Sequence, residues 1–103
     1  MNYSCVIVDD ERKTRELIQS IIEDNFSDLE ISGTADSVLE GLKVINTLKP
    51  NLVFMDIKLP DGSGFDILES ITDNKCKVIF ISAFNEYAIK AFKFSAIDYI
   101  LKP

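Results

Sequence analysis

The sequence contains no histidine, and that absence excludes several kinds of catalytic and metal site. Hydrolases that pair a serine or cysteine nucleophile with a histidine base are excluded, because no such base is present. The only cysteines, Cys5 and Cys76, provide too few ligands for a zinc site in a chain without histidine. In a reducing compartment we expect both thiols to pack as small apolar side chains.

Long apolar runs and an excess of positive charge are also lacking. No stretch approaches the roughly 18 apolar residues of a membrane-spanning helix, so the sequence predicts no membrane span. Residues 1–4 lead directly into an apolar run, without the basic segment and cleavage site of a secretory signal, so we expect a cytoplasmic protein. The net charge of −6 argues against direct contact with nucleic acid, because phosphate backbones require a basic surface.

Four short apolar runs each end at a polar residue suited to phosphate or metal chemistry. Such runs predict buried parallel strands. Because helical patterns lie between the strands, the order is βαβαβαβαβ, which predicts one parallel sheet with helices on both faces in a single domain. The residues that follow the four runs are Asp9 with Asp10, then Asp56, Ser82 and Lys102.

The expected elements leave one face of the sheet short of a helix. Four helices accompany five strands, and the chain ends at Pro103, where a fifth helix would be expected. Either the sequence is a fragment or something else covers that face. The segment Leu59–Gly64 is expected to be a loop, because proline and glycine punctuate it. Strands are expected at residues 3–8, 30–35, 52–55, 77–81 and 97–101, and helices at 11–25, from a cap at 36 or 37 up to about 48, around 65–71, and at 85–94.

Carboxylates at the strand ends predict a metal and phosphoryl site. Ligands of an open α/β sheet bind outside the carboxyl ends of the strands, so Asp9, Asp10 and Asp56 are expected to converge. A hard divalent cation relieves their mutual repulsion, and without cysteine or histidine ligands the cluster predicts Mg²⁺ rather than Zn²⁺. Asp56 is the candidate nucleophile, because a carboxylate can accept a phosphoryl group. Lys102 and Ser82 can contact the remaining phosphoryl oxygens.

Each of these residues taken alone has a simpler interpretation. Asp9 and Asp10 can be a solvated turn, Ser82 a hydroxyl at a strand end, and Lys102 a surface lysine. Their common position at the strand ends favours the site.

Several segments together resemble the receiver domain of two-component response regulators. They occur in the order typical of that family and cover almost the full chain, so jointly they are far more specific than each alone. The matching segments are Val8-Asp9-Asp10-Glu11, residues 55–64 from Met55 to Gly64, Ile81-Ser82-Ala83 and residues 98–103 from Asp98 to Pro103.

The resemblance implies a role for each matching residue. Asp56 would accept phosphate from a sensor histidine kinase. Asp10 and Asp56 would bind Mg²⁺ directly, together with the backbone carbonyl of Lys58. Asp9 would act mainly through water, and Lys102 would contact the phosphoryl group. The domain would promote only its own phosphorylation and dephosphorylation, so it would not be an enzyme in the usual sense.

The resemblance also implies a switch and a fold. Ser82 would move toward the phosphoryl group and Tyr99 would turn inward behind it, although an aromatic residue in a strand is more often part of the core. The implied fold is a flavodoxin-like, doubly wound sheet with strand order 2-1-3-4-5. Residues 1–103 would then be a receiver domain that lacks its last helix and any C-terminal output domain.

Residues 83–92 further resemble receivers of the LytTR class, in which a DNA-binding domain follows and regulates transcription. The expected helix at 85–94 is unusually apolar, so the fourth helix and fifth strand could form a homodimer surface, with ordinary core packing as the simpler interpretation.

Three other classes compete with this interpretation. A phosphatase with an aspartate nucleophile would need a second acid two residues later, where Lys58 stands. A flavin-binding domain would need a phosphate loop after the first strand, where Asp9, Asp10 and Glu11 would repel phosphate. A docking module that does not depend on phosphorylation remains the main alternative, and we rank it lower because every chemical residue is present.

Overall fold

A parallel sheet organises the computed structural model, which describes residues 2–71, 76–84, 86–93 and 96–102. Most expected elements are found within a few residues of their predicted bounds. The strands of the sheet are β1 (Tyr3–Val8), β2 (Leu29–Ala35), β3 (Leu52–Met55), β6 (Lys77–Ser82) and β7 (Asp98–Leu101). The helices are α1 (Arg12–Asn25), α2 (Val38–Leu48), α3 (Gly64–Ser70) and α4 (Ala88–Lys93). The ends of the expected fourth helix, Asn85 and Phe94, lie outside the described residues.

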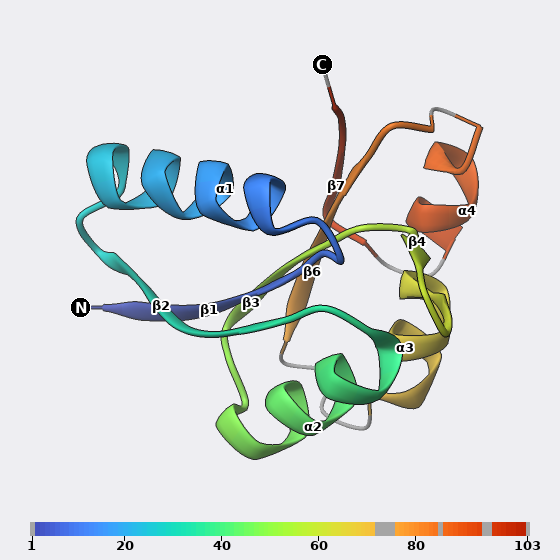
Figure 1. Cartoon of the computed structure of the whole chain (residues 1–103), viewed down its shortest axis with the longest axis horizontal. Coiled ribbons are helices and arrows are strands. Elements are labelled where there is room, and N and C mark those ends of the chain that lie inside the picture. Colours follow the sequence, from blue (N-terminus) through green and yellow to red (C-terminus); the bar gives the residue numbers. More distant parts are fainter. Residues whose placement is uncertain (1, 72–75, 85, 94–95, 103) are drawn as a thin grey trace.

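The five strands lie in the order β2-β1-β3-β6-β7, and all neighbours are parallel. Numbered along the chain within this sheet, the order is 2-1-3-4-5, so the predicted doubly wound fold is confirmed. β1 lies directly beside β3 because the chain crosses over after β2 (Figure 1). The residues that follow these two strands, Asp9 and Asp56, therefore reach the same edge of the sheet.

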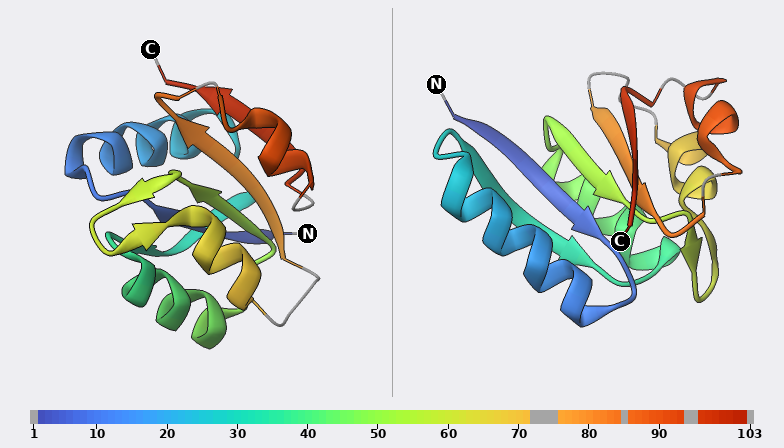
Figure 2. Two further views of the ribbon diagram at one scale, coloured as in Figure 1. Left: turned by 90° about the vertical axis from the view of Figure 1, so that its right-hand side faces the viewer. Right: turned by 90° about the horizontal axis from the view of Figure 1, so that it is seen from above.

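Two apolar clusters fill the two faces of the sheet. On one face, Cys5 and Ile7 of β1 pack with Ile22 of α1. On the other face, the alternate residues Val6 and Val8 belong to a larger cluster with α2 and α3. Successive side chains of a strand point to opposite faces, so one strand serves both clusters. Figures 1 and 2 show α1 on one side of the sheet and α2 and α3 on the other.

Apolar side chains remain exposed on the α1 side. Leu17 and Ile21 of α1 are 55% and 46% exposed. Ile100 of β7 is 45% exposed, and its pairing with Ile81 puts it on the same side of the sheet. This face therefore has apolar surface that a further element could bury. No helix in the described part of the chain combines the length and the apolar character needed to cross a membrane.

The segment after β3 is more ordered than predicted. Instead of a plain loop from Leu59 to Gly64, it contains two short antiparallel strands, β4 (Lys58–Leu59) and β5 (Gly62–Ser63). Gly62 has a φ of +152°, a backbone conformation that only glycine adopts without strain. Two-residue strands are too short to show an alternating apolar pattern, so the sequence indicated only the turn.

Candidate functional site

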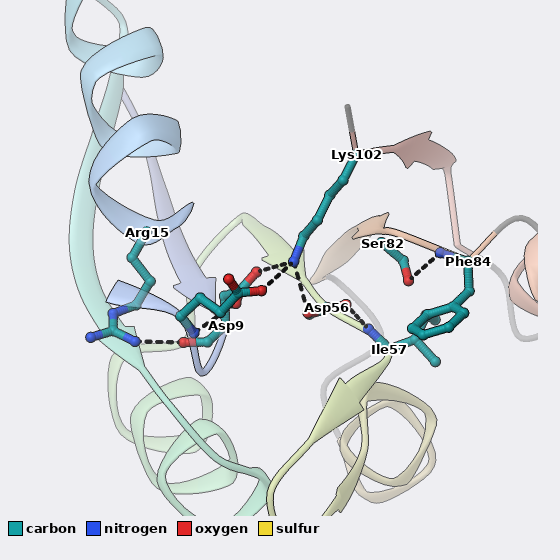
Figure 3. A network of polar contacts seen from close by, with 8 residues as sticks. Asp9, Arg15, Asp56, Ile57, Ser82, Phe84 and Lys102 are labelled. Atoms are coloured by element: carbon teal, nitrogen blue, oxygen red, sulfur yellow. Dashed lines mark hydrogen bonds and ion pairs between the residues drawn. The ribbon is translucent and has the colours of Figure 1, made fainter. Parts of the chain in front are cut away.

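Lys102, the residue after β7, lies at the centre of a group of acidic side chains (Figure 3). Its Nζ atom is 3.0 Å from Asp9 Oδ2 and 3.0 Å from Asp56 Oδ2. Glu11 Oε1 is further away, at 3.7 Å. The backbone of Lys102 is held in turn, since its amide donates to the carbonyl of Ser82 at 2.7 Å. One ammonium group thus connects the ends of β1, β3 and β7.

Asp9 is almost fully buried, and hydrogen bonds fix both its backbone and its carboxylate. Its amide donates to the carbonyl of Ala35 at 3.0 Å, and Oδ1 accepts from the amide of Glu11 at 2.9 Å. Arg15 Nη1 donates to the carbonyl of Asp9 at 2.7 Å. Oδ2 is buried, and its partner among the described residues is the ammonium of Lys102, which it shares with Asp56. A buried carboxylate oxygen that shares a single ammonium keeps acceptor capacity that a cation or its water would use.

Asp56 follows β3, and its side chain is 9% exposed. Its amide donates to the carbonyl of Val8 at 2.9 Å, and its Oδ1 accepts from the amide of Ile57 at 2.7 Å. Gly64 passes close behind it, since a Cβ atom at Gly64 would lie only 2.4 Å from the Asp56 carbonyl oxygen. The position of the Asp56 carboxylate is therefore set by backbone contacts as well as by Lys102.

The pKa shifts of the site have a common cause. Burial raises the pKa of Asp56, the charge of Asp9 raises it as well, and Lys102 lowers it. Burial alone would lower the pKa of Lys102, but the hydrogen bonds and charges of Asp56 and Asp9 outweigh it, so that pKa is raised. Two buried carboxylates share one ammonium. The charged form of Lys102 is therefore strongly favoured, whereas the single positive charge balances the two negative charges only in part. The site therefore favours the arrival of a further cation.

The residues after β1 form the densest acidic group in the described part of the chain. Carboxylate oxygens of Asp9, Asp10 and Glu11 lie within 4.8 Å of one another. Asp10 is exposed, unlike Asp9, so it can reach a solvated ion. Asp56 is not part of this group, but Lys102 connects it to Asp9. An all-oxygen donor set with an under-satisfied buried carboxylate fits Mg²⁺, which prefers few carboxylates and keeps several waters. Glu11, for which no role had been predicted, also belongs to the group.

The two predicted switch residues meet at Phe84. Ser82 ends β6 with no exposure, and its Oγ accepts from the amide of Phe84 at 3.2 Å (Figure 3). The hydroxyl of Tyr99 donates to the carbonyl of Phe84. Burial raises the pKa of Tyr99, which keeps its hydroxyl protonated as a donor. Ser82 and Tyr99 therefore both contact the backbone of Phe84, one at its amide and the other at its carbonyl. Nothing in the sequence pattern indicates this role of Phe84.

The side chain of Lys58 contacts the same residue. Its Nζ atom lies 4.4 Å from the centroid of the Phe84 ring and 6.0 Å from that of Tyr87. A cation over an aromatic face is worth about 0.5–1 kcal/mol at an exposed site. The ammonium of Lys58 is thus engaged by the segment after β6, and its backbone carbonyl is the group expected to face a metal.

Comparison with known proteins agrees with the fold and identifies the family. A family model described as the response regulator receiver domain matches residues 5–103. A response regulatory protein of Vibrio cholerae is 40% identical over 101 residues, which cover 97% of this chain and 42% of that protein. The transcriptional regulatory protein BtsR of Escherichia coli K12 is 38% identical over 99 residues, which cover 95% of this chain and 41% of BtsR. The chain therefore spans about two fifths of the length of these relatives.

Solved structures of response regulator domains have the same fold as this chain. The response regulatory domain of mrkE from Klebsiella pneumoniae matches with a TM-score of 0.89 and 34% identity, over 97% of this chain and 83% of that one. The response regulator domain of CheB from Thermotoga maritima matches with a TM-score of 0.87 and 29% identity, over 100% of this chain and 80% of that one.

The chain belongs to the response regulator receiver domain family. It is the receiver domain of a two-component response regulator, a regulatory signalling domain rather than an enzyme of the usual kind. Some of its relatives are transcriptional regulators. Receiver domains in general bind Mg²⁺ through acidic residues and act with histidine kinases.

Proposed function

We propose that Asp56 is the phosphoacceptor of this domain and receives its phosphoryl group from a sensor histidine kinase. The observation that carries the proposal is the position of Lys102, 3.0 Å from both Asp9 and Asp56. In the transfer, an Asp56 oxygen attacks phosphorus as the bond from phosphorus to the donor nitrogen breaks, which leaves an acyl phosphate on Asp56. Lys102 already contacts Oδ2 and is placed to stabilise the added negative charge.

Mg²⁺ would be held by Asp10, Asp56 and the backbone carbonyl of Lys58, with Asp9 acting through water. Bound there, the ion would neutralise charge on the transferred phosphoryl group. The buried and under-satisfied Oδ2 of Asp9 supports this assignment, as does the grouping of Asp10 with Asp9 and Glu11.

Phosphorylation would switch the surface around Ser82 and Tyr99. A phosphoryl group on Asp56 offers acceptor oxygens to which the Ser82 hydroxyl would donate, and a turn of the Ser82 side chain toward them would weaken the hydrogen bond that its Oγ now accepts from the amide of Phe84. Because Tyr99 donates to the carbonyl of the same residue, a movement of Phe84 would also release Tyr99.

Mass spectrometry after treatment with acetyl phosphate tests the proposal directly. The parent chain should gain one phosphoryl group in the presence of Mg²⁺ and little without it, and Asp56→Ala should gain none. A phosphoryl group on Asp56→Ala would place the acceptor elsewhere. A parent chain that takes up neither phosphate nor Mg²⁺ with beryllium fluoride would favour the docking module that does not depend on phosphorylation.

The output is proposed to be transcription control through a C-terminal DNA-binding domain of the LytTR class. The similarity to BtsR, a transcriptional regulatory protein, supports the coarser part of this proposal. The α4 and β7 surface is proposed to form a homodimer after phosphorylation, since Leu101 of β7 is 52% exposed. Sedimentation of Leu101→Ser with and without beryllium fluoride tests it, and equal self-association of parent and variant would contradict it.

We also propose that a fifth helix covers the exposed apolar side chains beside α1, and that the output domain follows this helix. The similar solved domains support this, because this chain covers only 80–83% of their length. Until that face is covered, the 103-residue chain should bind a hydrophobic dye such as anilinonaphthalene sulfonate. The double variant Ile21→Ser with Ile100→Ser should bind less dye, and equal binding would contradict the proposal.

A further inference from the structure

Asp61, in the turn of the β4–β5 hairpin, makes two hydrogen bonds to a helix that is far away in the sequence. Its Oδ1 accepts from the amide of Val38 at 2.7 Å, and its Oδ2 accepts from the amide of Leu39 at 3.1 Å. Ser37 caps the next amide of the same helix, that of Glu40, at 3.1 Å. Three of the free amides at the start of α2 are thus satisfied, two of them by the hairpin.

These hydrogen bonds favour the ionised form of Asp61. The amides of Val38 and Leu39 hold the pKa of Asp61 below its usual range. The positive end of the α2 dipole also favours a negative charge at this position.

The helix that Asp61 caps packs against β1, the strand that leads to Asp9 and Asp10. Gly41 of α2 lies against β1, since a Cβ atom there would be in van der Waals contact, at 3.4 Å, with a methyl group of Val8. Just before α2, the carbonyl of Ala35 accepts from the amide of Asp9. The start of α2 is thus fixed relative to Asp9 and Asp10.

The hairpin that Asp61 anchors carries the other half of the site. Lys58 pairs with Ser63 across the hairpin, so the position of the Lys58 carbonyl follows the position of the hairpin. At its base, the hairpin starts two residues after Asp56, whose amide donates to the carbonyl of Val8. Asp61 therefore closes a ring of contacts that runs from β1 through α2 and the hairpin back to β3.

The geometry points to Asp61 as a positioning residue that fixes the Lys58 carbonyl relative to Asp10 for the binding of Mg²⁺. This inference rests on the proposed function. Asp61 contacts neither Asp56 nor Lys102 in the described structure, and it acts through the backbone of the hairpin. Outer residues that orient metal ligands typically change metal affinity by about 10–100-fold when they are removed.

Three variants of the 103-residue chain test the inference. Asp61→Ala removes the anchor, and Asp61→Asn keeps one acceptor oxygen. Ser37→Ala is the matched control, because it uncaps the same helix without releasing the hairpin. Two quantities are compared, the hydrogen exchange of residues 58–63 without metal and the affinity for Mg²⁺ by calorimetry.

Asp61→Ala should exchange faster in the hairpin and bind Mg²⁺ about tenfold more weakly. Asp61→Asn should fall between Asp61→Ala and the parent, and Ser37→Ala should match the parent in both measurements. Equal values for Asp61→Ala and Ser37→Ala would overturn the inference, as would unchanged hairpin exchange in Asp61→Ala. A parent chain that binds no Mg²⁺ would contradict the proposed function, whereas the exchange measurement decides separately whether Asp61 anchors the hairpin.

Discussion

Replacing Lys102 with methionine removes the only cation seen between Asp9 and Asp56 in the described structure, while keeping a side chain of similar length. Each of the two contacts is 3.0 Å long, and the Lys102 side chain is 14% exposed. At an effective dielectric constant of about 20, one such pair has a Coulomb attraction of about 5–6 kcal/mol. The desolvation of three charged groups offsets much of that attraction.

The net change in unfolding free energy depends on the two carboxylates that remain after Lys102 is replaced. Two buried carboxylates would face each other without a counter-ion, and removing one partner of a buried pair typically costs about 3–5 kcal/mol. For a domain of this size, we expect the melting temperature to fall by more than about 12 °C. Lys102→Arg retains the charge and serves as the control, with a smaller loss because the guanidinium has a different shape.

Urea unfolding followed by circular dichroism measures the effect at pH 7 and again near pH 4. Burial raises the pKa of Asp56, so its carboxylate is protonated to a greater extent at the lower pH, and Lys102→Met should lose less stability there. Mg²⁺ should stabilise the variant more than the parent, because no ammonium competes for the same oxygens. An unfolding free energy within about 0.5 kcal/mol of the parent at pH 7 would refute the reasoning, as would a loss that does not change with pH.

Three further predictions concern packing and ionisation in the sheet and at the site. Gly64→Ala should lower the unfolding free energy by about 3 kcal/mol, because its Cβ would collide with backbone. Gly33→Ala should lower it by only about 1 kcal/mol, because its Cβ would meet side chains that can move. Urea unfolding measures both losses, and equal losses would be contrary evidence. Asp56→Asn should raise the unfolding free energy at pH 7, because the raised pKa of Asp56 means that its ionised form destabilises the native state. This gain should shrink as the pH falls through that pKa, and a gain that stays constant with pH would argue against the reasoning. Burial raises the pKa of Cys5 to about 11, so iodoacetamide at pH 8 should modify Cys5 only after the chain unfolds. Peptide mass spectrometry measures the modification, and rapid labelling of the folded chain would contradict the prediction.

The strands and their order were the most predictable part of the fold. Runs such as Leu52–Met55 are apolar throughout because both faces of the parallel sheet are covered. The placement of polar residues directly after the runs then predicted which side chains meet, and the proximity of Asp9 to Asp56 follows from β1 lying beside β3. The strand order itself came from the resemblance of the motifs, since alternation alone fits several doubly wound orders.

The contacts between segments were not predictable in the same way. The role of Phe84 depends on its backbone, whose amide and carbonyl meet Ser82 and Tyr99. Any residue type has these backbone groups, so no sequence pattern marks them. The sequence pattern indicates Asp61 only as part of a turn, because its hydrogen-bond partners lie 22 and 23 residues away in the sequence.

The sequence by itself determined the chemistry available to this protein: carboxylates, a hydroxyl and a lysine, with no histidine, each following an apolar strand. Short-range patterns encode this because strand and helix periods are properties of neighbouring residues. Only the tertiary structure decided that one ammonium is shared between Asp9 and Asp56, and that the hairpin after β3 is anchored to α2. Those contacts depend on distances between segments far apart in the chain, which are fixed only when the sheet and its helices pack together.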